Sequence, residues 1–259
     1  IREAGNAGEE KAAALIQETL SSFGVECRLE EFSFDTFQIK KAKLTITEPY
    51  TKEYTVTGYD RCANTAEDGL KVPFVYAENG DDISLAQVKG KIVMVNDPVR
   101  KDMYQKLVKA GAVGFISIAG SPLDEGVDLI PRAYGLPKNL PGEEKKAAGK
   151  EAQNYDNRIP GVSVHYKDAI ELVTKGASQA CLVVEQETVT RTSRNVVARI
   201  EGTDKAEEIL TLTAHYDSVP EGPGAYDNMS GGAIIMELCR YFQTHRPRRT
   251  MEFVWFGAE

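Results

Sequence analysis

Apolar side chains recur at helical spacing near the start of the chain. In residues 6–23 they fall three or four positions apart, which places them on one face of a helix. They are Ala12, Leu15, Ile16, Leu20 and Phe23. Glu9 and Glu10 stand in the first turn, where the helix dipole favours acidic residues, and Gly24 follows the last apolar position. The sequence therefore predicts an amphipathic helix over residues 6–23.

Alternation of apolar and polar residues follows this helix and predicts strands. Apolar residues occupy every second position from Val25 to Leu29, and their parity changes before Phe32. Such a change indicates a bulge near residues 30–31. Residues 42–46 alternate again, with lysine and threonine between the apolar side chains, as in a half-solvated edge strand.

Between about residues 62 and 189 short apolar runs alternate with amphipathic segments. The runs predict buried strands and the amphipathic segments predict helices. Expected strands are 91–95, 113–118, 161–164 and 180–187, and expected helices are 99–110 and 167–174. Residues 121–157 are rich in Gly, Pro, Lys and Glu and predict a long loop with room for one short helix. A block of this kind can form a self-contained α/β module with its own core.

The last part of the chain predicts a β-α-β unit. A helix is expected over residues 228–242, between the last two of three strands. The expected strands are 195–200, 209–214 and 250–256. A right-handed crossover makes the two strands that flank the helix parallel. His215 and Glu259 then follow the carboxyl ends of neighbouring strands, where open α/β sheets place their sites.

Composition and charge limit the class of protein. The chain has 259 residues, of which 42% are hydrophobic and 27% charged, as in an ordinary globular protein. With 39 acidic and 31 basic residues its formal net charge is −8. Nucleic acid is therefore disfavoured as a partner, because phosphate binding needs a basic face. No apolar run reaches the roughly 20 residues of a membrane-spanning helix.

The cysteines add little to this picture. They have no Cys-x-x-Cys spacing, so they predict neither a zinc knuckle nor a dense disulfide framework. The four are Cys27, Cys62, Cys181 and Cys239. Cys62 and Cys181 lie near the two ends of the middle block, so a disulfide between them is conceivable. The cellular compartment stays open.

The richest chemistry lies in His215-Tyr216-Asp217, which follows an apolar strand, and in Asp227-Asn228, twelve positions after the histidine. Taken alone, a histidine after a strand is usually structural, and an Asp-Asn pair before a helix is usually an N-cap. Together they gather one imidazole and two carboxylates at the end of one strand. Hard divalent metals favour such ligands and zinc accepts them, so the pattern predicts a metal site.

Three segments around these residues carry a resemblance to a known family. They are residues 214–218 (Ala-His-Tyr-Asp-Ser), 224–231 (Gly-Ala-Tyr-Asp-Asn-Met-Ser-Gly) and 256–259 (Phe-Gly-Ala-Glu). In order, spacing and expected secondary structure they resemble the co-catalytic two-zinc exopeptidases, the secreted bacterial and yeast aminopeptidases related to glutamate carboxypeptidase.

The middle block resembles the protease-associated domain that is often inserted in this family. The residues that carry this likeness are 88–95, 110–114 and 159–163. The two resemblances imply an α/β fold class, in which a zinc-exopeptidase-type mixed sheet flanked by helices, incomplete in this chain, carries an inserted α/β protease-associated domain. Residues 1–61 and 190–259 would form the amino-terminal part of the peptidase domain, and residues 62–189 the inserted domain.

The family resemblance also implies a role for each residue of the candidate site. His215 resembles the ligand of one zinc, and Asp227 resembles the carboxylate that bridges both zincs. Asp217 resembles the acid that orients the histidine. Glu259 resembles the general base that takes a proton from the attacking water. The bond after the bridging aspartate is cis in this family, so we expect a cis Asp227-Asn228 bond.

The resembled family has further ligands that this sequence does not contain: a glutamate directly after the base and, later, an aspartate and a histidine. His165 in the middle block and His245 in a basic turn do not replace them, since both are interpreted as solvated surface residues. We therefore expect two zinc ions in the complete enzyme, weak or absent zinc binding in this chain, and no activity of this chain alone.

Two classes of function remain. The first is the amino-terminal part of a zinc-dependent exopeptidase that acts on peptides, an aminopeptidase before a carboxypeptidase of the same family. The second is a non-catalytic receptor or binding module on the same fold, which we expect to have lost His215, Asp227 or Glu259. A glutaminyl cyclase is disfavoured because this inserted domain is not typical there. The resemblance implies secretion or a cell-surface location, and the oligomeric state stays open.

Overall fold

The computed structural model describes residues 1–140 and 155–259, which divide into two compact units. The first unit consists of Ile1–Thr36 and Thr190–Glu259, and the second unit of Phe37–Val189. The candidate site residues named above all belong to the first unit.

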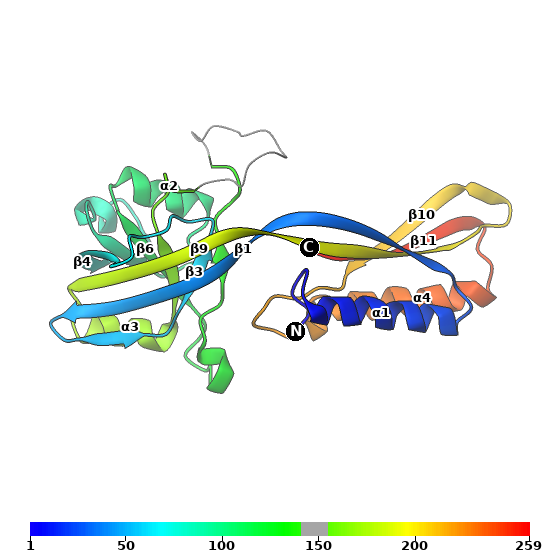
Figure 1. Cartoon of the computed structure of the whole chain (residues 1–259), viewed down its shortest axis with the longest axis horizontal. Helices are drawn as coiled ribbons and strands as arrows, with labels where there is room; N and C mark the ends of the chain where they lie inside the picture. The colour runs from blue at the N-terminus through cyan, green and yellow to red at the C-terminus, as the bar shows by residue number, and fades with distance from the viewer. Residues whose placement is uncertain (141–154) are drawn as a thin grey trace. The chain divides into compact units, whose positions relative to one another are not determined.

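Two long strands, β1 (Cys27–Glu48) and β9 (Gln179–Ile200), run through the boundaries between the units (Figure 1). The sequence analysis expected separate shorter strands here and assigned residues 37–61 to the peptidase part, whereas the structure places residues 37–61 in the second unit. The apolar pattern does not predict that β9 is one continuous strand, because none of residues 187–192 is buried. Three threonines and a valine in this stretch still favour extended backbone.

The sheet of the first unit has the order β10–β11–β9. β10 (Lys205–His215) and β11 (Arg249–Phe256) are parallel, as the β-α-β pattern predicts, and His215 is in register with Phe256. β9 pairs with β11 in the antiparallel direction. The mixed sheet flanked by helices expected from the sequence is therefore confirmed.

Helices α1 (Ala7–Ser22) and α4 (Gly231–Thr244) both lie on one side of this sheet (Figure 1). They bury a core with the inward-facing residues of the strands. Its fully or nearly fully buried members include Leu20, Val196, Ala198, Tyr216, Ile235, Cys239, Phe253 and Trp255. Trp255 Nε1 donates to the carbonyl of Gly232 at 3.1 Å, so α4 is held to the sheet by a buried hydrogen bond as well as by packing.

The first helix begins and ends where its sequence predicts. The Asn6 side chain accepts hydrogen bonds from the amides of Gly8 and Glu9, which are among the unpaired donors of a helix start. Gly24 follows the helix with φ +73°, a backbone angle that glycine adopts without strain. None of the helices in the described part of the chain has the length and apolar character needed to cross a membrane.

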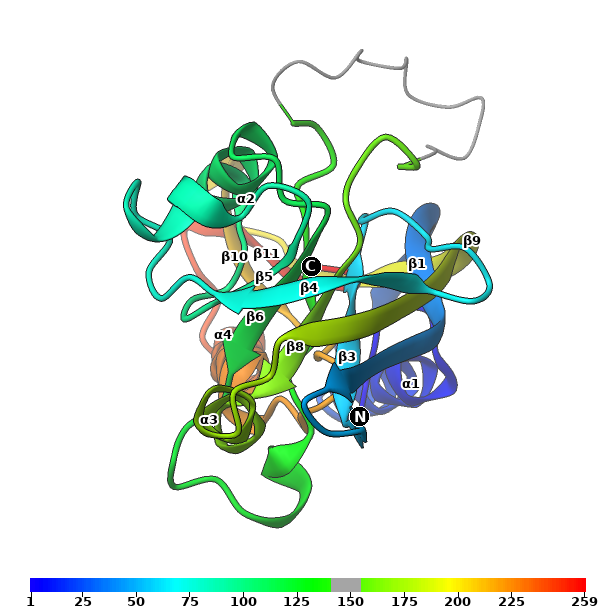
Figure 2. The same ribbon diagram turned by 90° about the vertical axis from the view of Figure 1, so that its left-hand side faces the viewer.

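The second unit contains a sheet of order β9–β4–β5–β6–β8–β3–β7. Its strands are β2 (Lys52–Tyr54, paired with β1), β3 (Val56–Asp60), β4 (Leu70–Tyr76), β5 (Ile92–Val95), β6 (Gly114–Ala119), β7 (Tyr134–Gly135) and β8 (Gly161–His165). β4, β5, β6 and β8 are parallel. Figure 2 shows α2 (Lys101–Lys109) and α3 (Tyr166–Thr174) on either side of this sheet, which explains why every residue of β5 is buried.

The long loop expected over residues 121–157 is described only in part, since residues 141–154 lie outside the described residues. Its described part contains one short 3₁₀ helix, η2 (Gly126–Leu129), and the two-residue strand β7. A second 3₁₀ helix, η1 (Ser84–Gln87), precedes β5. The identity of the second unit as a protease-associated domain stays a prediction.

His165 is not the surface residue that the sequence suggested. It ends β8, which lies between β3 and β6, and only 1% of it is exposed. Its Nδ1 accepts from the amide of Lys167 at the start of α3, and its Nε2 lies 3.1 Å from Asp124 Oδ2. The strand was predicted to stop one residue earlier, so the burial of this side chain was missed. His245, in contrast, is exposed as expected and stacks on Tyr241 with ring centroids 4.1 Å apart.

All four cysteines are in the described part of the chain, and all are free thiols. The disulfide between Cys62 and Cys181 that the sequence left open is therefore not formed. Burial raises the pKa of Cys62 to about 12 and that of Cys239 to about 12. Cys181 and Cys27 are partly exposed.

Replacing Leu20 by alanine should destabilise the first unit by about 2–5 kcal/mol, because the side chain is fully buried between α1 and the sheet. Leu15→Ala on the same helix is the control, since Leu15 is 61% exposed and should change stability by less than about 0.5 kcal/mol. Trp255, the single tryptophan, is buried in the same core and reports unfolding in urea by its fluorescence. Equal effects of the two substitutions would contradict the packing of α1.

Thiol labelling should separate the cysteines into two classes. Cys181 should react with Ellman's reagent at pH 8 in the native protein, and Cys27 should react there more slowly because burial raises its pKa, whereas Cys62 and Cys239 should react only on unfolding. Burial both shields the second pair and suppresses its thiolate form. Release of all four thiols at one rate without denaturant would show that the cores described here are wrong.

Candidate functional site

A pocket of about 390 Å³ opens at the carboxyl ends of β10 and β11. The end of β10 contributes one wall and the residues after β11 contribute another. The lining residues are Thr213, Ala214, His215, Asn228, Phe256, Gly257, Ala258 and Glu259. The parallel pairing of the two strands thus brings the histidine and the glutamate singled out by sequence to one pocket.

His215 and Asp227 are in direct contact. Nε2 of His215 lies 3.0 Å from Oδ1 of Asp227. The histidine side chain is largely buried, with 18% exposed, whereas the aspartate side chain is 83% exposed. The strand therefore fixes the imidazole, and the loop presents the carboxylate to solvent.

Asp217 connects the two strand ends behind this pair. Its Oδ1 lies 3.3 Å from Nδ1 of His215, close enough for an ion pair, but Nδ1 makes no hydrogen bond with any residue that the structure describes. Both carboxylate oxygens accept from the backbone amide of Glu259 at 3.3 Å. Asp217, only 7% exposed, thus contacts both the histidine and the residue expected to act as a base.

Asp227 itself lies in a kinked turn, Ala225–Ser230, that precedes α4, and its backbone angles (φ −108°, ψ 97°) are not helical. The Asp227-Asn228 bond is cis, as the family resemblance implies. Oδ1 of Asn228 accepts from the amide of Gly231 at 3.2 Å, so the asparagine provides a cap near the start of α4. Asn228 therefore takes the capping role that an Asp-Asn pair usually has, while the carboxylate of Asp227 stays exposed.

A buried polar layer beneath the site was missed by the sequence analysis. Tyr216 is fully buried; burial raises its pKa, and its hydroxyl donates to the carbonyl of Arg194 at 2.8 Å. Glu9, which the sequence analysis placed in the first turn of α1 without a further role, is 2% exposed and accepts from Gly5 N and Ser193 Oγ, each at 2.6 Å. No local signal marks Glu9, because its hydroxyl partner is 184 positions away.

The donor set fits one metal ion at the His215–Asp227 pair. Zinc binds imidazole nitrogen and carboxylate oxygen at about 2.0–2.2 Å, so two tetrahedral ligands of one ion stand roughly 3.3–3.6 Å apart. His215 Nε2 and Asp227 Oδ1 are 3.0 Å apart, a hydrogen-bond distance that only a small separation of the two side chains would open to an ion. In residues 1–140 and 155–259, however, no group of three or more His, Cys, Asp or Glu side chains is arranged to hold a metal. The described site therefore supplies part of a coordination shell.

Comparison with known proteins confirms the resemblance to zinc exopeptidases. Residues 195–259 match peptidase family M28. The chain is 28% identical over 262 residues to aminopeptidase YwaD of Bacillus subtilis, covering all of this chain and 51% of that protein. It is 24% identical over 269 residues to carboxypeptidase Q of Mus musculus, of which it covers 55%. The chain thus spans about half the length of the curated relatives it matches.

Solved structures show the same fold. A zinc aminopeptidase from Bacillus subtilis superposes with a TM-score of 0.74 at 26% identity, covering 99% of this chain and 57% of that one. The peptidase M28 precursor from Shewanella amazonensis has a TM-score of 0.70 at 22% identity, covering 99% of this chain and 60% of that one. The fold class expected from the sequence is confirmed by these likenesses.

Proposed function

We propose that this chain forms the amino-terminal part of a zinc-dependent aminopeptidase. The observation that carries the proposal is the contact between His215 Nε2 and Asp227 Oδ1 at 3.0 Å, at a pocket that Glu259 also lines. An imidazole, an exposed carboxylate and a second carboxylate at the carboxyl ends of parallel strands suit metal-assisted hydrolysis. The relatives include proteins named as aminopeptidases, which supports the choice of peptide substrates.

In this proposal His215 and Asp227 hold zinc, and residues beyond those of the described site complete the coordination. Zinc, when bound, polarises the scissile carbonyl and acidifies water. Asp217 keeps the imidazole oriented through its contact with Nδ1, as carboxylates commonly do behind a ligating histidine. Because Asp217 also accepts from the amide of Glu259, it fixes the backbone of the base at the same time.

Glu259 takes the general-base role. It lines the pocket beside His215, and its side chain is the carboxylate at the end of β11. A carboxylate there can accept the proton of a water that attacks the peptide carbonyl and return it to the leaving amine. We further propose two zinc ions in the complete enzyme, a secreted or cell-surface location, and no activity for this chain by itself.

Two alternatives are kept. A non-catalytic receptor on this fold would not need His215, Asp227 and Glu259, and all three are present. A carboxypeptidase uses the same hydrolytic chemistry, and a relative at 24% identity is named carboxypeptidase Q. The two exopeptidase types are distinguished by substrates blocked at one end. Hydrolysis of a peptide amide with a free amino terminus, but not of its amino-acetylated form, supports the aminopeptidase.

The 259-residue chain should not retain stoichiometric zinc after dialysis, because His215 and Asp227 alone fall short of the three protein ligands usual in a catalytic site. Elemental analysis measures the zinc content, and His215→Ala should leave it unchanged at this low level. Retention of two zinc ions per chain would contradict the proposal and require ligands other than those named here.

In the full protein that contains this chain, Glu259→Gln should lower kcat about 10²–10⁴-fold with the zinc content unchanged, because the attacking water loses its proton acceptor. Glu237→Gln is the matched control, since Glu237 lies on the outer face of α4 in a surface pair with Arg240. Loss of activity on treatment with a chelator should accompany this result. Unchanged turnover in Glu259→Gln would favour the receptor.

A further inference from the structure

Arg2 makes a set of hydrogen bonds with a segment more than 200 positions away. Its Nε donates to the carbonyl of Tyr216 at 2.7 Å, its Nη1 to that of Pro223 at 2.5 Å, and its Nη2 to that of Gly224 at 3.1 Å. Its backbone amide donates to Ser218 Oγ at 2.8 Å, and the Ser218 amide donates to the Arg2 carbonyl at 3.0 Å. One residue therefore contacts this segment at both ends.

The segment in question connects the two proposed metal ligands. Residues 216–224 contain neither helix nor strand, so no helical turn or strand ladder holds this stretch of backbone. Tyr216 directly follows His215, and Gly224 precedes Asp227 by three positions. Since Arg2 bonds to both Tyr216 and Gly224, it sets the separation between the points where the loop leaves β10 and where it enters the turn of Asp227.

The geometry requires a guanidinium group. Its donors lie in one plane and diverge in a fixed fork, so a single group can reach three carbonyls, whereas a lysine ammonium acts as a point charge on a flexible stem. Gly224 allows the approach: with φ +60°, it lacks the side chain whose Cβ would lie 2.9 Å from Arg2 Nη2 and 2.8 Å from Ser218 Cβ. The contact thus depends on both residues, since Arg2 supplies the donors and Gly224 leaves room for them.

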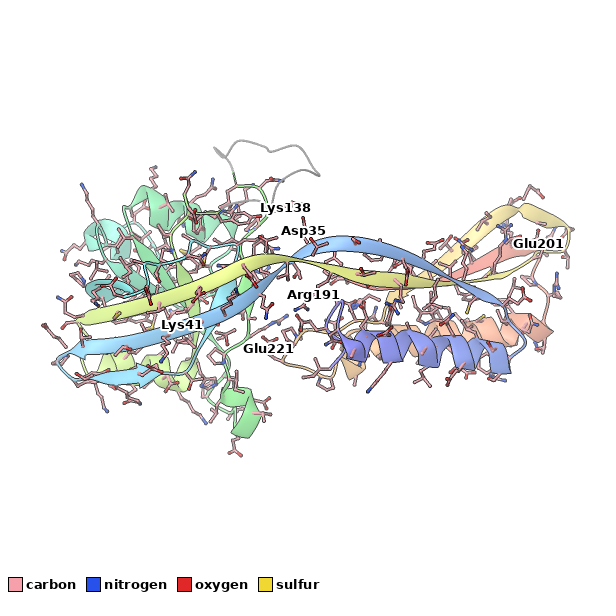
Figure 3. The ribbon with its side chains drawn as sticks, in the orientation of Figure 1. Asp35, Lys41, Lys138, Arg191, Glu201 and Glu221 are labelled. Carbon is pink, nitrogen blue, oxygen red and sulfur yellow. The ribbon has the colours of Figure 1, made fainter. Side chains whose placement is uncertain are left out.

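The segment that carries Arg2 is itself fixed to the first unit. Glu3 forms an ion pair of 2.9 Å with Arg191, which lies on β9 (Figure 3). Asn6 caps α1, and the buried Glu9 bonds to Gly5 N and Ser193 Oγ. These contacts hold the residues on the carboxyl side of Arg2 against the sheet. The backbone from which the Arg2 side chain extends is therefore fixed in position.

We propose that Arg2 is a positioning residue that holds Asp227 in place relative to His215 by clamping the loop between them. The exposed Asp227 carboxylate depends on this loop for its placement, while the imidazole is fixed by the strand. The consequence for metal affinity rests on the proposed function. The consequence for loop order does not, so the two are tested separately.

The first test measures loop order without metal. Arg2→Ala in the chelator-treated full protein should speed hydrogen exchange of the amides in residues 216–224 by about tenfold or more, with α4 amides unchanged. Arg2→Lys should restore the exchange rates only in part. Arg240→Ala, which removes an arginine from an exposed surface pair on α4, is the control and should change neither region. Wild-type exchange rates of residues 216–224 in Arg2→Ala would overturn the proposal.

The second test measures the metal. Arg2→Ala should weaken zinc binding, measured by chelator competition, about 10–100-fold, the range typical of residues that orient ligands. Gly224→Ala should weaken it at least as much, because its Cβ would lie 2.8 Å from the carbonyl oxygen of Asp227 as well as 2.9 Å from Arg2 Nη2. Zinc affinity within twofold of wild type in Arg2→Ala overturns the positioning role. A wild-type protein that binds no zinc refutes the proposed function instead, and the exchange measurement then decides whether Arg2 orders the loop.

Discussion

The parallel pairing of β10 and β11 is the constraint on which the candidate site depends. Their register places His215 opposite Phe256, and the ladder continues past the strand ends, where Tyr216 N donates to the Phe256 carbonyl at 2.8 Å. A slip of one residue would turn His215 to the other face of the sheet. Trp255 opposes such a slip, since it is fully buried and bonded to Gly232. Core packing thus determines which side chains meet at the pocket.

The two proposed ligands, His215 and Asp227, are held in position in different ways. His215 is part of a strand, and its ring is confined between the sheet and Asp217. Asp227 is on a turn, and its carboxylate is mostly in solvent, so its position depends on the backbone of the preceding loop and on its contact with His215. This asymmetry explains how Arg2, far from both ligands in sequence, can affect the position of one of them. The strand is sufficient to position His215, whereas the loop that carries Asp227 needs a further contact to hold it.

Sequence reasoning succeeded where short-range patterns carry the information. Helical periodicity located α1, and apolar runs located buried strands such as β5 and β6, because burial on one or both faces leaves a direct record in the residue types. The β-α-β pattern was sufficient to predict the parallel pair at the site. The comparison with the family added roles for residues that periodicity cannot assign.

The failures have two causes, which are a misplaced strand end and dependence on distant residues. His165 was interpreted as a surface residue because the buried strand over residues 161–164 was expected to end one position before it. Glu9 and Arg2 look like ordinary charged residues at the start of a helix, and their partners lie 184 and more than 200 positions away. In the middle of β9 no residue is buried, so no pattern of apolar residues there indicates how the strand pairs.

The order in which the units can be completed follows from their continuity along the chain. Phe37–Val189 is one uninterrupted stretch, so all the contacts of the second unit become available once residue 189 has been synthesised. The first unit must wait, since α1 has no sheet to cover until Thr190–Glu259 emerges from the ribosome. During that interval the apolar face of α1 is without its native partners.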